Sequence, residues 1–254
     1  MTQAETARAF HALHKKGEPL VLYNIWDAGS AKIVAEAGAK AIATGSWSVA
    51  AAQGYDDGQV LPLDTLLAIA SRITASTALP VSIDFEGGYA KRPEFLAPNI
   101  ASLIATGAVG LNFEDQIVGG EGLHSIEDQA HRIAAIRGVA DEAGIPLFIN
   151  ARTDVFLKSK PPDHARHMKE ATDRCDVYAE AGASGFFVPG LVDPDLIGHM
   201  CAHTKLPVNA YMKDGAPSIA EMAKLGVSRI SHGPGPYHQA MRDLTERASG
   251  LYQA

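Results

Sequence analysis

The sequence predicts an α/β fold, a (β/α)₈ barrel (TIM barrel). Short apolar runs alternate with amphipathic segments, and the chain is long enough for eight such pairs. The 254 residues allow eight strand–helix pairs of roughly thirty residues each. Short, nearly continuous apolar runs are typical of parallel strands that are buried on both faces. Eight units are the number that closes a parallel barrel. The predicted strands are 20–26, 41–46, 81–86, 110–115, 147–153, 185–189, 207–212 and 229–232.

The segments between these runs carry helix start and stop signals. Hydrophobic residues recur at helical spacing, and several segments open with a capping Ser or Asp. Four of them end in glycine just before the next apolar run, at Gly38, Gly107, Gly182 and Gly226. Glycine adopts the left-handed C-cap conformation at little cost, so the repeated signal indicates a repeated helix–strand unit. The clearest predicted helices are 63–76, 125–143, 163–181 and 218–225.

An open, doubly wound sheet is the alternative fold. It would carry a glycine-rich dinucleotide fingerprint after the first strand. Residues 24–30 read NIWDAGS and do not match that fingerprint. No low-complexity linker interrupts the alternation, so we expect residues 1–254 to form a single barrel domain.

Composition narrows the class of partner. The net charge of −7 and the scattered Lys and Arg residues argue against nucleic acid as a partner. The two cysteines, Cys175 and Cys201, lie in helical segments and indicate no disulfide framework, which fits a reducing cytoplasm. The first ten residues lack the apolar core of a signal peptide, and no stretch is long enough to span a bilayer. We therefore expect a cytoplasmic protein with no membrane association.

Charged side chains end three neighbouring predicted strands. Asp84 and Glu86, Glu114 and Arg152 would meet where the carboxyl ends of these strands converge. Burying an unpaired charge is costly, so the cluster implies a partner, and Mg²⁺ with an anionic carboxylate suits it. The alternative is that these residues only cap the helices that follow.

Five motifs, in order, resemble the isocitrate lyase/phosphoenolpyruvate mutase superfamily. The resemblance is greatest to members that are methylisocitrate lyase-like or carboxyvinyl-carboxyphosphonate phosphorylmutase-like. It implies a Mg²⁺-dependent barrel enzyme, with Mn²⁺ as a substitute, that acts on 2-oxo or 2-hydroxy carboxylates through an enolate. It also implies a homo-oligomer, a tetramer or dimer, in which a C-terminal helix can be exchanged. The motifs are N-x-WDAGS at 24–30, GS at 45–46, D-x-EGGY at 84–89, N-x-EDQ at 112–116 and NARTD at 150–154.

The resemblance assigns roles to particular residues. Asp84 would be the direct acidic contact to the metal, whereas Glu86, Glu114 and Asp57 would hold metal-bound water. Backbone N–H groups of Gly45 and Ser46 would bind a substrate carboxylate, as a glycine-containing turn can. Arg152 would form the second contact to that carboxylate, because its guanidinium binds carboxylates in bidentate fashion.

The sequence departs from the family at the loop after the fourth strand. Family lyases carry a Lys-(Lys/Arg)-Cys-Gly-His loop whose Cys is the acid, but here residues 116–125 read QIVGGEGLHS. The mutase and phosphonopyruvate hydrolase branches have a different loop and a His where this chain has Pro189. This chain therefore lacks a residue that the lyases use and a residue that the mutase and hydrolase branches use.

Other residues are candidates for the missing proton transfer and for the pocket wall. The three glycines of the shortened loop would let it close as a lid over a bound substrate, which makes Glu121 and His124 of this loop candidate proton-transfer groups. Tyr89 is another candidate, because it lies near the predicted metal. A solvated turn, with His124 next to a helix start, is the alternative. Asn209 and Trp26 would line the far and near sides of the pocket, although Trp26 could equally be a packing residue.

Together these features predict a lyase of the EC 4.1.3 type that makes or breaks a carbon–carbon bond beside a 2-oxo carboxylate. Two alternatives stay open. One is carbon–phosphorus chemistry of the phosphonopyruvate type. The other is a non-catalytic protein that binds a 2-oxo acid.

Overall fold

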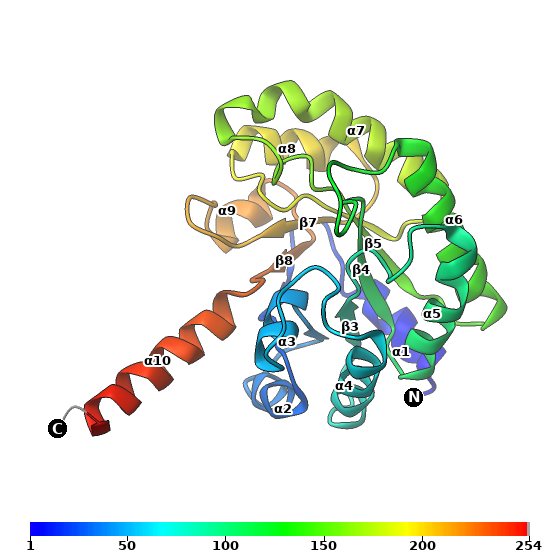
Figure 1. The fold of residues 1–254 in the computed structure, drawn as a ribbon. Helices are drawn as coiled ribbons and strands as arrows, with labels where there is room; N and C mark the ends of the chain where they lie inside the picture. The colour runs from blue at the N-terminus through cyan, green and yellow to red at the C-terminus, as the bar shows by residue number, and fades with distance from the viewer. Residues whose placement is uncertain (253–254) are drawn as a thin grey trace.

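The computed structural model describes residues 1–252 and shows eight parallel strands surrounded by helices (Figure 1). Hydrogen-bonded neighbours follow the order β1-β8-β7-β6-β5-β4-β3-β2. A parallel bridge between Ile25 and Thr44 joins the first and second strand segments and closes the barrel. The strands are β1 Leu20–Leu22, β2 Ile42–Ala43, β3 Val81–Asp84, β4 Gly110–Glu114, β5 Phe148–Arg152, β6 Gly185–Phe187, β7 Val208–Tyr211 and β8 Arg229–Ser231.

All eight predicted strands are confirmed, but each is shorter than its apolar run. Most of the residues lost belong to the turns that follow, and three, at 41, 147 and 207, precede their strands. Glu86, for example, has a φ of 48°, in the left-handed region, which ends strand geometry just past β3.

The predicted helices are also confirmed, each beginning and ending within one or two residues of the expected bounds. The short helix after β2 was not predicted, because residues 46–52 read as a continuation of the Gly45 turn. The helices are α1 Gln3–Ala12, α2 Ala28–Glu36, α3 Ser46–Ala52, α4 Leu63–Ala75, α5 Pro93–Ala105, α6 Ile126–Glu142, α7 His164–Glu180, α8 Pro194–His203, α9 Ile219–Lys224 and α10 Gly235–Tyr252, with a 3₁₀ turn η1 at Pro161–Asp163.

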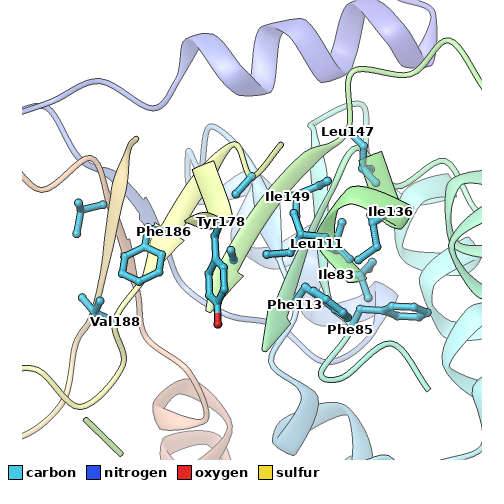
Figure 2. Packing of buried hydrophobic residues seen from close by; sticks show 14 of the residues in the cluster. Ile83, Phe85, Leu111, Phe113, Ile136, Leu147, Ile149, Tyr178, Phe186 and Val188 are labelled. Atoms are coloured by element: carbon cyan, nitrogen blue, oxygen red, sulfur yellow. The ribbon is translucent and has the colours of Figure 1, made fainter. Parts of the chain in front are cut away.

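Outward-facing strand residues pack against the helices. Ile83, Leu111 and Ile149 are fully buried between the sheet and side chains such as Ile136 of α6 (Figure 2). Burying such side chains contributes about 1.5–3 kcal/mol each. This layer fixes the strands whose ends carry the charged cluster.

Inward-facing residues follow every second position of each strand. Phe148 faces inward at the amino-terminal end of β5, where its ring stacks on His14 at a centroid distance of 4.0 Å and lies 5.4 Å from the Phe10 ring. Gly110 leaves room for this contact, since a Cβ there would lie 2.8 Å from the Phe10 ring. The end of α1 and the segment that follows it thus close this end of the barrel, and the opposite end stays open for a site.

Helix α10 extends away from the barrel (Figure 1). Leu244, Leu251 and Tyr252 are exposed along it. In residues 1–252, none of the helices combines the length and apolar character needed to cross a membrane.

Candidate active site

A cavity of about 210 Å³ lies at the carboxyl ends of the strands. Among residues 1–252, the charged residues that line it are two aspartates and one arginine. Asparagine and serine side chains add neutral polar groups, and apolar and aromatic side chains complete the wall. The lining residues are Asn24, Gly45, Ser46, Trp47, Asp57, Asp84, Asn112, Arg152, Leu157, Phe187, Pro189, Tyr211, Ser231, Gly233 and Pro234.

Asp84 is the last residue of β3 and faces the cavity. Its Oδ2 accepts a hydrogen bond from the Ser46 N–H at 3.1 Å, and its backbone N–H donates to Thr44 Oγ1 at 2.8 Å. Its Oδ1 is buried and has no hydrogen-bond partner in the protein. A buried carboxylate oxygen without a donor is costly unless a cation or a ligand meets it.

Glu86 lies in the turn just after β3. Its Oε2 accepts from the Gln59 N–H at 2.9 Å. Burial, together with the nearby Asp57 and Asp84 carboxylates, raises the pKa of Glu86 to about 8. The side chain therefore favours its neutral form unless positive charge is added nearby.

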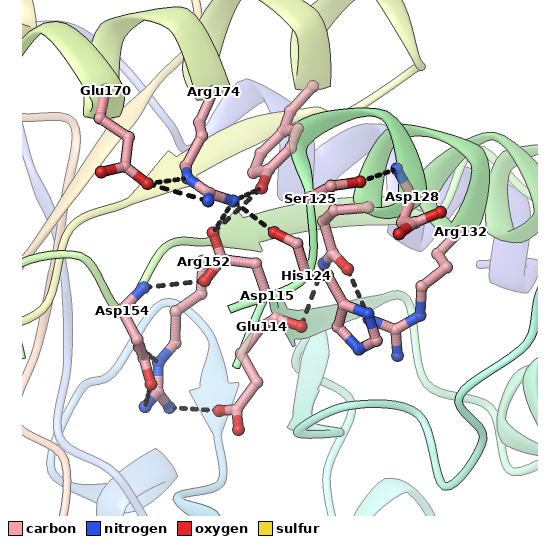
Figure 3. Close-up of polar contacts among 12 residues, drawn as sticks. Glu114, Asp115, His124, Ser125, Asp128, Arg132, Arg152, Asp154, Glu170 and Arg174 are labelled. Carbon is pink, nitrogen blue, oxygen red and sulfur yellow. Dashed lines mark hydrogen bonds and ion pairs between the residues drawn. The ribbon is translucent and has the colours of Figure 1, made fainter. Parts of the chain in front are cut away.

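Glu114 and Arg152 form a buried ion pair at the ends of β4 and β5 (Figure 3). Arg152 Nη1 lies 2.9 Å from Glu114 Oε2, and Arg152 Nε lies 2.6 Å from Asp154 Oδ1. Burial raises the pKa of Glu114 and the Arg152 guanidinium opposes that rise, while the two carboxylates raise the pKa of Arg152. We take Arg152 as charged, because it has two acidic partners and can lose its proton only with difficulty. Arg152 still lines the cavity and keeps N–H groups for a substrate.

Asp57 completes the acidic cluster at the cavity mouth, where it is the most exposed member. Desolvation and the Asp84 charge raise its pKa. The structure therefore brings Asp84, Glu86, Glu114 and Arg152 into one small volume, as the strand-end pattern predicts, and places Asp57 beside them.

A second buried network holds this volume in place from outside (Figure 3). Asp115 Oδ2 accepts from Arg174 Nη1 at 3.1 Å and from the Tyr178 hydroxyl at 3.0 Å, both on α7. Its Oδ1 accepts from the Asp154 N–H at 3.0 Å. These bonds tie α7 to the ends of β4 and β5, so Asp115 supports the site without facing the cavity.

The donor set suits a hard cation held largely through water. Within residues 1–252, no three His, Cys, Asp or Glu side chains converge closely enough to coordinate a metal together. The unpartnered Asp84 Oδ1 would supply one direct oxygen to such a cation, and the surrounding carboxylates would accept hydrogen bonds from its waters. Mg²⁺ typically keeps several waters and binds through one or two carboxylates.

The backbone donors expected to hold a carboxylate are both engaged. The Gly45 N–H donates to the Ile25 carbonyl at 3.3 Å, and the Ser46 N–H donates to Asp84. Gly45 is the N-cap residue of α3. A substrate would therefore have to displace the Asp84 carboxylate from Ser46.

Two residues expected to line the pocket lie elsewhere. Trp26 faces an outer groove beside α10, where its ring meets Tyr237 at 5.1 Å. Asn209 is buried inside the barrel, and its Nδ2 donates to Ser231 Oγ at 3.1 Å. Ser231, rather than Asn209, lines the cavity.

The residues expected to transfer protons also lie apart from the cavity. His124 shares a separate groove with Lys91, Asp128 and Arg132, and burial lowers its pKa. Glu121 is exposed. Their loop is a compact turn closed by an antiparallel bridge between Gln116 and Leu123.

Tyr89 also stays out of the cavity lining. It is half-buried against Phe85, at a ring centroid distance of 5.7 Å, and has a φ of 56°. Burial raises its pKa.

Several lining residues were not among the predicted site residues. Trp47 lies in the unpredicted helix α3, whereas Asn112 and Phe187 lie on strands. Asn112 could have been found from the sequence, because a polar amide inside a buried strand needs hydrogen-bond partners. The apolar wall residues had none, since buried wall and buried core read alike in sequence.

Fold and site define a (β/α)₈ barrel with an acidic, carboxylate-compatible cavity at its carboxyl end. The family model described as phosphoenolpyruvate phosphomutase matches residues 10–252. The chain therefore belongs to the phosphoenolpyruvate mutase/isocitrate lyase superfamily, a superfamily of enzymes that includes lyases, mutases and hydrolases acting on carboxylates.

The relatives differ in their named activities. A Burkholderia cenocepacia J2315 protein with the provisional name phosphonomutase has a crystal structure with 47% identity and a TM-score of 0.95, covering 99% of this chain and 100% of that chain. The uncharacterized Mycobacterium tuberculosis protein Rv1998c is 33% identical over 97% of this chain and 86% of its own length. The 2-methylisocitrate lyase of Escherichia coli K12 is 26% identical over 99% of this chain and 85% of its own length.

A more distant structure shares the fold. Phosphonopyruvate hydrolase, in complex with oxalate and Mg²⁺, has 21% identity and a TM-score of 0.85, covering 98% of this chain and 87% of that chain.

Proposed function

We propose that this protein is a Mg²⁺-dependent carbon–carbon bond lyase that acts on a small 2-oxo or 2-hydroxy carboxylate through an enolate. One observation carries the proposal. Asp84 presents an unpartnered, buried carboxylate oxygen in the same cavity as the Arg152 guanidinium. A cation would meet the Asp84 oxygen, and a substrate carboxylate would accept from the N–H groups that Arg152 keeps beyond its bonds to Glu114 and Asp154.

The residues divide the work by their chemistry. Asp84 would hold Mg²⁺ directly, with Glu86, Glu114 and Asp57 accepting hydrogen bonds from its waters. Bound Mg²⁺ supplies a Lewis acid beside a 2-oxo oxygen and stabilises negative charge that develops there. Arg152 would bind and orient the substrate carboxylate through its remaining N–H groups. Leu157, Phe187 and Pro189 form an apolar wall that excludes water.

The cavity favours carbon–carbon over carbon–phosphorus chemistry. Arg152 is the only cationic side chain that lines it, and Pro189 stands where the phosphonate branches are expected to place a His. Transferring phosphoryl groups are stabilised by clamps of Arg, Lys and Mg²⁺, and this cavity offers a single guanidinium for that purpose. Because one relative carries the name phosphonomutase, carbon–phosphorus chemistry is a second outcome that the test must distinguish.

The test is a ¹H NMR time course with Mg²⁺ and a pool of 2-oxo and 2-hydroxy di- and tricarboxylates plus phosphonopyruvate. The variants are Asp84→Ala and, as a matched control, Asp56→Ala, which removes an exposed carboxylate outside the cavity lining. Release of pyruvate, glyoxylate or succinate by the wild type and Asp56→Ala, but not by Asp84→Ala, supports the lyase. Release of inorganic phosphate instead would assign the phosphonate branch. Binding that requires Mg²⁺ and Asp84 without any turnover would replace the lyase with a binding role.

A further inference from the structure

A buried arginine lies beneath the cavity and takes no part in the site described so far. Arg229 begins β8, is 1% exposed, and forms no ion pair with any carboxylate of residues 1–252. Its Nη2 donates to Asn112 Oδ1 at 3.2 Å, whereas its Nε and Nη1 have no hydrogen-bond partner in the protein. A buried guanidinium without an acidic partner destabilises a fold, so its position calls for another explanation.

The contact with Arg229 fixes which way the Asn112 amide points. A guanidinium only donates hydrogen bonds, so the Asn112 atom that faces it must be the oxygen. Asn150 Nδ2 donates to the same oxygen at 2.8 Å. The Asn112 Nδ2 group is consequently directed away from both donors, and no acceptor in the described part of the chain takes its hydrogens.

Asn112 is also one of the residues that line the cavity, and its Cα pairs with that of Asp84 across β3 and β4. A ligand atom bound next to Asp84 is therefore next to Asn112 as well. Nδ2 is a neutral donor and suits an oxygen acceptor.

We propose that Asn112 is a substrate-binding residue whose Nδ2 donates to an oxygen of the bound 2-oxo carboxylate, and that Arg229 is the positioning residue that orients this amide. The proposal rests on the proposed function, since it takes the ligand to be an anionic carboxylate held beside a metal at Asp84.

Electrostatics agree with the geometry. Burial lowers the pKa of Arg229 to about 9, and Asp84 is the one charge that opposes the change. The guanidinium therefore stays charged at neutral pH, and the Asp84 carboxylate favours that charge.

The experiment separates metal binding from ligand binding. Mn²⁺ binding is measured by electron paramagnetic resonance, and oxalate binding in the presence of Mg²⁺ by calorimetry, on the full-length chain. Asn112→Leu removes the donor at nearly constant size. The matched control is Gln3→Leu, which removes a part-buried amide that donates to Ile104 and Ala108, outside the cavity lining.

We expect Asn112→Leu to bind Mn²⁺ within about threefold of the wild type and oxalate roughly 10- to 100-fold more weakly, the range for a lost hydrogen bond to a charged group. Asn112→Asp, which presents an acceptor and a negative charge, should bind oxalate more weakly still. Gln3→Leu should match the wild type in both measurements.

Arg229 is tested by its coupling to Asn112. Arg229→Met should weaken oxalate binding in the wild-type background and change it less than twofold in the Asn112→Leu background, because the amide that it orients is gone. Arg229→Lys keeps the charge but loses the guanidinium geometry, and provides a second variant if Arg229→Met does not fold.

Three results would overturn the inference, and they are distinguishable. Unchanged oxalate affinity in Asn112→Leu, with Mn²⁺ binding intact, removes Asn112 from the substrate contacts. Equal losses from Arg229→Met in both backgrounds remove the positioning role of Arg229. Failure of the wild type to bind Mn²⁺ or oxalate rejects the proposed function itself, and the inference with it.

Discussion

The two ends of the barrel differ in packing and in charge, although the same eight strands form both. At the amino-terminal end, His14 stacks on Phe148, and the Phe10 ring meets both of them edge-on, which excludes solvent. At the carboxyl end, Asp84 keeps a carboxylate oxygen without a donor, and Glu86 has a pKa raised to about 8. One end contributes stability and the other carries unsatisfied charge, a division that is expected where binding geometry is kept at the expense of stability.

The largest expected effect is a loss of stability at the amino-terminal end that leaves metal binding at the carboxyl end unchanged. Phe148→Ala leaves a cavity among fully buried aromatic side chains and should lower the free energy of unfolding by about 3–5 kcal/mol. Mn²⁺ affinity of the folded protein should stay within about threefold of the wild type, because the change lies at the other end of the barrel. Urea unfolding and Mn²⁺ titration check both parts. Phe95→Ala is the control, since Phe95 is exposed and its loss should cost under about 0.5 kcal/mol.

A second effect concerns the turn that carries Glu86. Arg132 Nη2 donates to the Gly87 carbonyl at 2.7 Å and to the Ala90 carbonyl at 3.1 Å, and its guanidinium stacks on Phe113. Arg132→Met releases this turn and should weaken metal binding roughly 10- to 100-fold, as is typical when support behind a metal ligand is lost. The exposed Arg72→Met is the control. Equal Mn²⁺ affinities in both variants would show that the turn holds its shape without Arg132.

A third effect gives the amino-terminal end a pH dependence. Burial and the Arg229 charge lower the pKa of His14 to about 3, so His14 stays neutral in the folded protein. The unfolded chain takes up this proton below about pH 6.5, so the stability contribution is complete above that pH and is lost as the pH falls toward 3. Between pH 7 and pH 5 the wild type should lose about 2 kcal/mol through this group.

The His14→Leu variant should remove that part of the pH dependence, and the exposed His131→Gln should leave it unchanged. Urea unfolding at pH 5 and pH 7 measures the difference. An identical loss in wild type and His14→Leu would mean that other groups titrate in its place.

The smallest expected effect tests the boundary of the carboxyl-end site. His124 lies in a groove with Lys91 and Arg132, outside the cavity lining. His124→Gln should therefore change Mn²⁺ and Mg²⁺–oxalate affinity by less than about threefold. A tenfold or greater loss of affinity would show that the loop that follows β4 contributes to the binding site.

The sequence predicts the fold well because parallel strands are buried on both faces and read as apolar runs. The convergence of Asp84, Glu114 and Arg152 is predictable for the same reason, since strand order places their ends together. Strand bounds are less predictable, because the turn conformation at Glu86 depends on the Gln59 N–H, a contact between distant residues.

Loop positions and wall residues could not be predicted. His124 is held by its carbonyl, which accepts from Arg174 on α7 at 3.0 Å, and no local pattern encodes such a contact. Trp47 reaches the cavity from a helix that the sequence did not reveal. Asn209 and Ser231 share a hydrogen bond, and only the three-dimensional register decides which of them lines the cavity.

The most direct test of the comparison is thermal unfolding of the wild type and Asp84→Asn, each with and without Mg²⁺. Without Mg²⁺ the variant should be at least as stable as the wild type, because an amide replaces a buried carboxylate that lacks a partner. At about 100-fold excess over the dissociation constant, Mg²⁺ should stabilise the wild type by about 2.7 kcal/mol and the variant by close to zero. Equal Mg²⁺ stabilisation of both proteins, or of neither, would contradict a metal site at Asp84.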